Sequence, residues 1–402
     1  MAGTTILRFE GHNYLRQRLL LATLSGKTVR IDNIRPEDED NPGLTDYEAS
    51  FLRLLEKVTN GCSVEISYTG TTVVYRPGVI IGGKIHHDCP PSRAISYFLE
   101  PMIALAPFAK TPMMLTMTGV TNDNVDVSID TLRTVLLPQL KRYGIEDSIE
   151  LKISKRGAPP LGGGEIFFRS PIIRTLKPLQ YTTEGQIKRI RGIAYATRVS
   201  PSMANRTVEA ARSLLTRYIP DVYIYTDVYK GAESGKSPGY ALTLVAESNT
   251  GVLLSSECAF QPRSKSGSAP MDVDQDEAFT KSNGAAAGQG EGGVSSMLVN
   301  DYSFPTPEDL GVRTARLLLQ EIRKGGTVDS VSQWLNVLFL ALGPEDVGKV
   351  RIGNLTPFTI QYLRDIKSFL GVTFKIKPDP ENRTVILTCL GTGYTNVNKN
   401  VQ

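Results

Sequence analysis

Histidine is scarce in this chain of 402 residues, which has only three, together with four cysteines and a single tryptophan. The cysteines lie far apart and show no Cys-x-x-Cys spacing, which excludes the usual zinc and disulfide patterns and indicates a reducing compartment. No run approaches the roughly 20 apolar residues of a membrane span. We therefore expect a soluble intracellular protein with no membrane contact and no bound metal.

The composition is that of an ordinary globular protein, with 41% hydrophobic and 21% charged residues, and the length suffices for more than one domain. The net charge of +4 allows contact with RNA but does not require it. Charge alone therefore decides nothing about the function.

One arrangement recurs along the chain: a segment with helical period, a short break, and two alternating strands separated by a polar turn. It occupies residues 45–75, 129–169, 205–247 and 356–390. We expect Asn205 to cap the third helix, and Pro378, Asp379 and Pro380 to form the last turn. The recurrence predicts an α/β fold of α+β repeats in which helices pack against sheets.

The composition changes sharply after the third of these segments. Residues 262–297 are rich in Gly, Ser, Ala and acidic residues and have no hydrophobic period, which predicts a disordered loop. The preceding residues 183–261 form a compact unit in this interpretation, and that unit could be an insertion.

A glycine-rich segment lies between two predicted strands. It reads Arg156-Gly157-Ala158-Pro159-Pro160-Leu161-Gly162-Gly163-Gly164-Glu165-Ile166. Successive amide N–H groups in such a loop can cradle a phosphate, with Lys155 and Arg156 supplying positive charge. A tight hairpin connection is the alternative for any isolated glycine-rich loop.

The string Arg-Gly-x-x-Pro-x-Gly-Gly-Gly-x-Ile resembles the signature of the RNA 3'-terminal phosphate cyclase family. Active members use ATP to adenylylate an RNA 3'-phosphate and close it to a 2',3'-cyclic ester. The resemblance covers nearly the whole chain. It implies that Arg156, Gly157, Pro160, Gly162, Gly163 and Gly164 form the family signature and bind an anion.

The same resemblance implies a large domain of three repeated units of sheet plus helices. Residues 1–182 would hold the first two repeats, and residues 298–402 would return to the large domain with the third. A smaller α/β domain, residues 183–261, would be inserted between them and followed by the disordered loop at 262–297.

Cyclase chemistry needs a histidine, because imidazole attacks the α-phosphate and then leaves readily. In the family this histidine begins the helix of the last repeat, where this chain has Phe358. Val331 and Trp334 replace a tyrosine and an aspartate of the family's nucleotide site. The resemblance thus implies a retained fold without cyclase activity and without a cofactor.

Other departures from the family pattern agree with this. The N-terminal motif keeps only its acid and one glycine in the run from Glu10 to Tyr14, while Tyr47 and Glu100 align with family glutamines. The acidic run at 36–40 would repel a triphosphate or form an ordinary solvated loop, and both interpretations stay open.

The histidines that remain lie in the first part of the chain. His86 and His87 could bind a metal or act as an acid/base pair, but neighbours on a strand point to opposite faces and cannot readily share a site. His12 is better explained as a packed or hydrogen-bonded polar residue.

A kept signature with a lost histidine is similar to the cyclase-like branch of eukaryotic nucleoli. The resemblance implies a ribosome biogenesis factor for early processing of the small-subunit pre-rRNA. Its partners would be a ribosome-assembly GTPase, pre-rRNA and components of the small-subunit processome. It would act as a scaffold or as an endonuclease that cleaves the spacer after the small-subunit rRNA, with an active cyclase as the remaining alternative.

Two groups of charged residues are candidate contacts. On the predicted helix at 356–370, one apolar face comprises Phe358, Tyr362, Ile366 and Phe369. Arg364, Asp365 and Lys367 would present mixed charge on or near the other face, as nuclease candidates or as a solvated face. Lys188, Arg189 and Arg191 could contact RNA or an acidic protein segment, or lie on an ordinary solvated strand.

Overall fold

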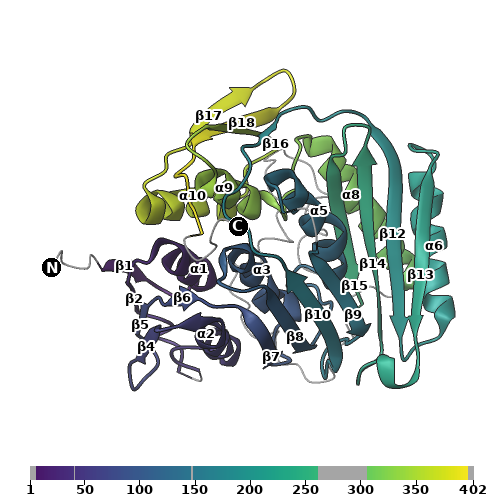
Figure 1. The fold of residues 1–402 in the computed structure, drawn as a ribbon. Helices are drawn as coiled ribbons and strands as arrows, with labels where there is room; N and C mark the ends of the chain where they lie inside the picture. Colours follow the sequence, from purple (N-terminus) through teal and green to yellow (C-terminus); the bar gives the residue numbers. More distant parts are fainter. Residues whose placement is uncertain (1–5, 40, 146–147, 261–305, 397–402) are drawn as a thin grey trace.

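The computed structural model describes residues 6–39, 41–145, 148–260 and 306–396. Within these ranges it is a mixed α/β protein with four four-stranded sheets and one two-stranded sheet, covered by helices (Figure 1). This confirms the predicted α/β class. The loop predicted at 262–297 lies outside the described residues.

The first sheet has the strand order β1-β2-β5-β4, in which β1 and β2 are parallel and the other pairs are antiparallel. The same part of the chain also forms a separate two-stranded ribbon, in which β3 pairs with β6. Its elements are β1 (Leu7–Glu10), α1 (Leu15–Ser25), β2 (Val29–Asp32), α2 (Asp46–Val58), β3 (Thr59–Asn60), β4 (Ser63–Ile66), β5 (Val73–Arg76) and β6 (Val79–Ile80).

The second sheet has the order β7-β8-β10-β9, again with one parallel pair followed by antiparallel pairs. Its second helical stretch is continuous but contains one π turn. Its elements are β7 (Gly83–Asp88), α3 (Ile95–Leu105), η1 (Ala106–Phe108), β8 (Met113–Gly119), α4 (Ile129–Thr131), η2 (Leu132–Leu136), α5 (Leu137–Leu140), η3 (Lys141–Tyr143), β9 (Glu150–Lys155) and β10 (Gly164–Ser170).

The third sheet, β11-β16-β18-β17, joins segments that lie far apart in the sequence. Gln180 of β11 pairs in parallel with Lys349 of β16. Its last turn falls later than expected, because β17 continues through Pro378 and Asp379. Its elements are β11 (Gln180–Tyr181), α9 (Gln333–Leu342), β16 (Val347–Ile352), α10 (Pro357–Leu370), β17 (Lys375–Asp379) and β18 (Thr384–Leu390).

The fourth sheet has a different order, β13-β12-β14-β15. The two strands that follow its first helix do not pair with each other, because β12 lies between β13 and β14 and pairs with both. Its elements are β12 (Ile187–Thr197), α6 (Pro201–Leu215), β13 (Val222–Tyr229), η4 (Gly231–Glu233), β14 (Gly239–Ser248), β15 (Leu253–Ala259) and α8 (Pro307–Lys324).

The helix α6 begins earlier than the sequence suggested. The hydroxyl of Ser200 accepts a hydrogen bond from the backbone N–H of Ser202, and Pro201 occupies the first helical turn. Asn205 therefore lies inside the helix, and its predicted capping role is wrong. A serine followed by proline is a stronger start signal than an asparagine within the helical period.

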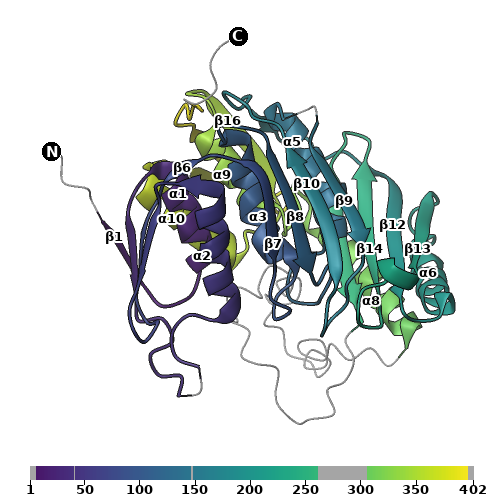
Figure 2. The ribbon, with the colours of Figure 1, turned by 60° about the horizontal axis from the view of Figure 1, so that its bottom comes forward.

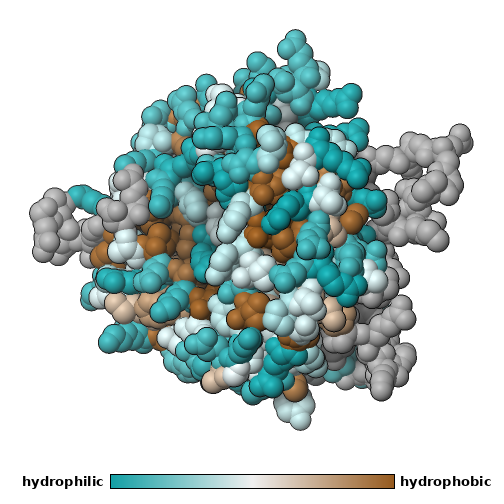
Figure 3. Space-filling model, turned by 90° about the vertical axis from the view of Figure 1, so that its right-hand side faces the viewer, coloured by the Kyte–Doolittle hydropathy of each residue, from teal (hydrophilic) through white to brown (hydrophobic). Residues whose placement is uncertain are grey.

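Both α6 and α8 pack against the fourth sheet and against each other. At their crossing a Cβ on Gly311 would overlap the backbone carbonyl of Thr207, so only glycine allows this close approach. Figure 2 shows the fourth sheet beside the second, with the first sheet at the opposite end of the molecule. Figure 3 views the side where α6 and β13 lie, and there hydrophobic residues are interspersed with hydrophilic ones.

The helices of the first three sheets pack together in the middle of the molecule. Helix α1 contacts α3 and α10, and α10 also contacts α9. This arrangement brings the N-terminal helix against helices from the second and third sheets. No helix in the described ranges is both long enough and apolar enough to cross a membrane.

Candidate functional site

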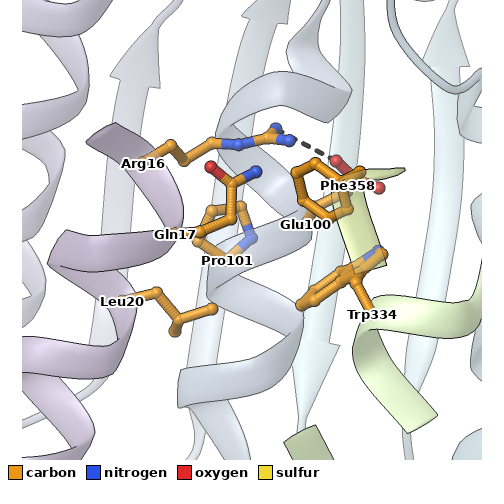
Figure 4. A pocket seen from close by; sticks show the side chains of 7 residues that line it. All are labelled: Arg16, Gln17, Leu20, Glu100, Pro101, Trp334 and Phe358. Carbon is orange, nitrogen blue, oxygen red and sulfur yellow. Dashed lines mark ion pairs between the residues drawn. The ribbon is translucent and has the colours of Figure 1, made fainter. Parts of the chain in front are cut away.

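A small cavity lies where α1, α3, α9 and α10 meet (Figure 4). Its volume is about 10 Å³, which is about the space that one water molecule requires. Its walls include Trp334, Phe358 and Glu100, three positions at which the sequence departs from the cyclase pattern. The lining residues are Arg16, Gln17, Leu20, Glu100, Pro101, Trp334 and Phe358.

Phe358 stands on the first turn of α10, which Thr356 caps by accepting a hydrogen bond from the N–H of Thr359 at 3.1 Å. Its ring is 4% exposed, lies 5.6 Å from the ring of Tyr14 and stacks on Tyr362 at 6.0 Å. A buried aromatic ring therefore fills the start of the helix, at the position where the resemblance places the histidine of a cyclase. No residue in the lining of this cavity can accept an adenylyl group as imidazole does.

Trp334 closes the cavity from α9. Its ring is 5% exposed and meets the ring of Tyr362 edge-on at 6.4 Å. Figure 4 shows Phe358 and Trp334 on the same side of the cavity, facing the side chains of α1. Together these two rings line the cavity with apolar surface. A nucleotide site instead needs polar groups that bind phosphate and ribose.

A buried network of charges and rings borders the cavity. Nη1 of Arg16 lies 3.0 Å from a carboxylate oxygen of Glu100 and donates to the carbonyl of Tyr97 at 2.7 Å. The guanidinium groups of Arg16 and Arg93 each lie 4.5 Å from the ring centre of Tyr97. Arg93 also forms a two-point ion pair with Asp126, at 2.9 and 2.7 Å.

Burial raises the pKa of Glu100 above its ordinary value, and the nearby Arg16 opposes this only in part. At Asp126 burial acts in the same direction, but the charge and hydrogen bonds of Arg93 outweigh it and hold the pKa below its ordinary value. The network thus neutralises two buried arginines with two buried carboxylates. Arg93 and Asp126 carried no signal in the sequence, because neither belongs to a recognisable motif.

Asp365 is not on the solvated side of α10, so its expected position is wrong. It is 2% exposed, lies 3.6 Å from Nε of Arg18 and accepts a hydrogen bond from Gln361 at 3.0 Å. Burial raises the pKa of Asp365 and lowers that of Arg18. Arg364 and Lys367 are exposed whereas Asp365 is buried, so the three nuclease candidates do not share one solvent-exposed face.

The family model for RNA 3'-terminal phosphate cyclase matches residues 7–376. The chain belongs to this family. It is 51% identical over 393 residues to a Dictyostelium discoideum protein named "Probable RNA 3'-terminal phosphate cyclase-like protein", covering 98% of this chain and 99% of the relative. It is 49% identical over 403 residues to the human "RNA 3'-terminal phosphate cyclase-like protein", covering 98% of each.

A third relative carries a functional name. The chain is 46% identical over 406 residues to the Schizosaccharomyces pombe "rRNA processing protein rcl1", covering 100% of both chains. These similarities confirm the resemblance to a cyclase-like protein.

Most of the family signature, including Arg156, is buried rather than open to a ligand. Arg156 is 0% exposed. Its two terminal nitrogens contact the two carboxylate oxygens of Asp130, and the contact of Nη2 is 2.8 Å long. Its guanidinium also lies 4.6 Å from the ring centre of Tyr195 on β12 and 3.4 Å from Asp227 on β13. Burial alone would lower the pKa of Arg156, but Asp130 raises it above the ordinary value.

The glycines of the signature allow backbones to approach one another. A Cβ on Gly157 or Gly164 would overlap backbone atoms of the other residue, and Gly162 and Gly163 have φ values of +60° and +81°. Amide groups of the loop are engaged internally: Gly162 donates to Ala158 at 3.0 Å and Arg156 to Glu233 at 2.9 Å. This differs from a phosphate cradle, in which the amides and the arginine would face a ligand.

The charged residues at the edges of the signature are also paired. Lys155 contacts Glu165 at 2.6 Å, while Pro160 is exposed. On β12, Arg189 pairs with Glu247 at 2.7 Å and Arg191 with Asp221 at 2.8 Å. Lys188 is exposed. Because Arg189 and Arg191 are paired with carboxylates, the three residues together offer less free positive charge than their sequence suggests.

The adjacent histidines point to opposite sides of β7, as strand alternation predicted. His86 is exposed and lies 3.1 Å from Asp88. His87 is 3% exposed and its Nε2 lies 3.0 Å from the hydroxyl of Ser50, and burial lowers its pKa to about 4. In the described ranges, no group of three or more His, Cys, Asp or Glu side chains could hold a metal ion.

We expect Asp365→Ala to destabilise the protein by about 3 kcal/mol or more, because it leaves the buried guanidinium of Arg18 without its carboxylate. Urea unfolding measures this change. Arg364→Ala, one position earlier and exposed, should change the free energy of unfolding by less than about 0.5 kcal/mol. Equal, small effects of both substitutions would contradict the buried Arg18–Asp365 pair.

We expect the free energy of unfolding to fall as the pH drops from about 6.5 to about 4, because His87 is buried in its neutral form. The folded-state pKa is about 4 and lies below the ordinary value of 6.5, so the unfolded chain takes up a proton first. The contribution at pH 5 is a loss of about 2 kcal/mol relative to neutral pH. Urea unfolding of His87→Gln should show a smaller loss than the wild type, whereas the exposed His86→Gln should not. An unchanged pH profile for His87→Gln would contradict this assignment.

Proposed function

We propose that this chain is a ribosome biogenesis factor for early processing of the small-subunit pre-rRNA, with a cyclase fold but no cyclase activity. The observation that carries the proposal is the small cavity lined by Phe358 and Trp334, which stand at positions that the resemblance assigns to the family's nucleotide site. The relatives named "cyclase-like" and the S. pombe relative named for rRNA processing support it. The chain would act as a scaffold that binds RNA and a GTPase.

The location and partners follow from this role. We infer a nucleolar location in the nucleus, with pre-rRNA and components of the small-subunit processome as partners, together with a ribosome-assembly GTPase. Lys155, Lys188, Arg189 and Arg191 are proposed contacts, although all but Lys188 already have a carboxylate partner. The role requires no cofactor, because a scaffold transfers no chemical group.

The family signature has a structural role in this proposal. Arg156 and its glycines join the second sheet to the fourth, where Arg156 meets Tyr195 and Asp227. An anion would have to displace Asp130 to reach this guanidinium.

An endonuclease that cleaves the spacer after the small-subunit rRNA is the alternative. Arg364 and Lys367 are exposed and could hold a phosphate, but Asp365 is engaged by Arg18 and would have to move to act as a base. An active cyclase is less well supported still, because Phe358 cannot form the covalent intermediate.

We also infer that the first three sheets are copies of one unit, since they share one strand order. The sequence predicts a large domain at 1–182 and 298–402, a small domain inserted at 183–261, and the intervening segment 262–297. Helix α8 packs on the fourth sheet with α6, so it belongs with the inserted domain. The return to the large domain therefore begins after Lys324 rather than at 298.

We expect no covalent adduct with AMP when the purified chain is incubated with radiolabelled ATP, and no cyclisation of an RNA 3'-phosphate. Phe358→His alone should restore neither activity, because Trp334 still fills the cavity. An active cyclase of the same family, assayed in parallel, is the positive control. Acid-labile label on the wild-type chain would refute the absence of cyclase activity.

We expect depletion of the chain in its own cells to make small-subunit pre-rRNA accumulate, and re-expression of the wild type to reverse this. Northern analysis of precursor rRNA measures the effect. If the chain is a scaffold, the isolated protein leaves the same precursor intact in solution. Normal processing after depletion would sink the proposed role. Site-specific cleavage by the pure protein, lost in a folded Asp365→Asn variant, would establish the nuclease instead.

A further inference from the structure

The outer face of the third sheet carries a regular array of basic side chains, which we call the lysine face: Lys349, Arg351, Lys375 and Lys377, with Thr388 and Ile386 between them. The pairing register sets two rows across the sheet. One row runs Lys349, Thr388, Lys375, and the next runs Arg351, Ile386, Lys377. Partners in an antiparallel register point to the same side, so all six side chains share one face.

This face is open. Lys375 and Lys377 are exposed, and Lys349 and Arg351 are half-buried. The opposite face is covered by α9, which contacts β16 and β18 where Val350 and Leu387 are fully buried. In Figure 1 the β17–β18 hairpin projects at the edge of the molecule, beyond α9 and α10.

The spacing of the array follows from sheet geometry. Alternate residues on one strand are about 7 Å apart, and strands separated by one intervening strand are about 10 Å apart. The charges therefore form a flat grid rather than a pocket. Such a grid suits a ligand with many evenly spaced negative charges.

The charges of the grid are only partly neutralised. Arg351 reaches Asp379 at 2.7 Å and lies 3.8 Å from Glu184. Among the described residues, the structure shows no ion pair for Lys349, Lys375 or Lys377. Acidic residues occur at the margins, where Glu345 and Asp346 precede β16 and Glu381 follows β17.

On the other three sheets, basic side chains lie on the same strands as acidic ones or form ion pairs with them. On the first sheet Arg30 pairs with Asp32 at 2.9 Å and Arg76 with Glu65. On the fourth, Arg189 and Arg191 are paired as described above. On the second, exposed Lys84 and Lys152 alternate with exposed Asp88 and Glu150 on the same strands. An excess of cations is therefore a property of the third sheet.

Protection of a sheet edge does not explain the whole array. Lysine and proline on an edge strand discourage pairing with other chains, and β17 has both, with Lys375, Lys377 and Pro378. Lys349 and Arg351 lie on β16, which is an inner strand paired on both sides. Edge protection gives no reason for cations there, in register with those of β17.

We propose that the lysine face binds the phosphate backbone of RNA without reading its sequence. Lysine is a flexible point charge that suits phosphate, and no member of the array is aromatic, so the face offers no platform on which bases could stack. An acidic peptide is a weaker fit, because Pro378 interrupts the hydrogen-bonding edge of β17 and the face has no apolar groove for side chains. This inference rests on the proposed role in pre-rRNA processing.

The test compares Lys349→Ala, Lys375→Ala and Lys377→Ala, combined in the full-length chain, with the wild type. Binding to a short RNA duplex and to one of its single strands is measured between about 50 and 200 mM salt. We expect the triple variant to bind at least about tenfold more weakly, with a salt slope flatter by about 2 to 3 units, since each lost phosphate contact removes about 0.9. RNAs of unrelated sequence should be affected equally.

The matched control removes three exposed lysines elsewhere, through Lys84→Ala, Lys110→Ala and Lys152→Ala, which changes the net charge equally. It should retain most of the affinity. Replacing the three lysines of the array by arginine should preserve binding and guards against misfolding of the alanine variant. Equal losses in both alanine variants, or wild-type affinity and salt slope in the array variant, would overturn the proposal.

Two further outcomes bear on the partner. Tighter binding of a polyglutamate peptide than of RNA at the same salt, lost with the array, would overturn the RNA assignment in favour of an acidic protein. No RNA binding by the wild type would overturn it as well. Neither result tests the proposed role in processing. That role is contradicted only if depletion leaves pre-rRNA processing unchanged.

Discussion

The ion pair between Arg156 and Asp130 is the interaction on which the rest of this structure depends. Both side chains are buried almost completely, and the guanidinium also meets Tyr195 and Asp227 of the fourth sheet. A lone charge at this depth would cost several kcal/mol, so each partner requires the other. The close backbone contacts of the signature glycines, and the docking of the fourth sheet on the second, both occur around this pair.

The small cavity between α1, α3, α9 and α10 is lined by both charged and aromatic side chains. Arg16 has the charge to hold a phosphate, yet here Glu100 neutralises it at 3.0 Å, and Glu100 stands where the resemblance places a glutamine. One substitution thus places a buried carboxyl group beside this arginine. The rings of Phe358 and Trp334 line the cavity at positions that the resemblance assigns to the nucleotide site, and the helices around them pack closely.

The sequence predicted the parts of this site that local pattern determines. The helical spacing of Phe358, Tyr362, Ile366 and Phe369 correctly identified the buried face of α10. Asp365 escaped prediction because it borders that face and is held by Arg18, a residue nearly 350 positions earlier in the chain. No local pattern can reveal such a pairing. The burial of Arg156 was missed for the same reason, since charge in a glycine-rich loop ordinarily indicates a ligand.

The sheet order of the inserted unit was beyond prediction, because the strand that separates β13 and β14 precedes both of them in the chain. The third sheet raises a related question of timing. Thr182, just after β11, receives a hydrogen bond from Arg351, which lies 169 residues later. At ribosomal speeds of about 5 to 20 residues per second, β11 waits roughly 10 to 30 seconds for its partner strand. The second sheet can be complete during that interval, while β11 of the third sheet is still without its partner strand.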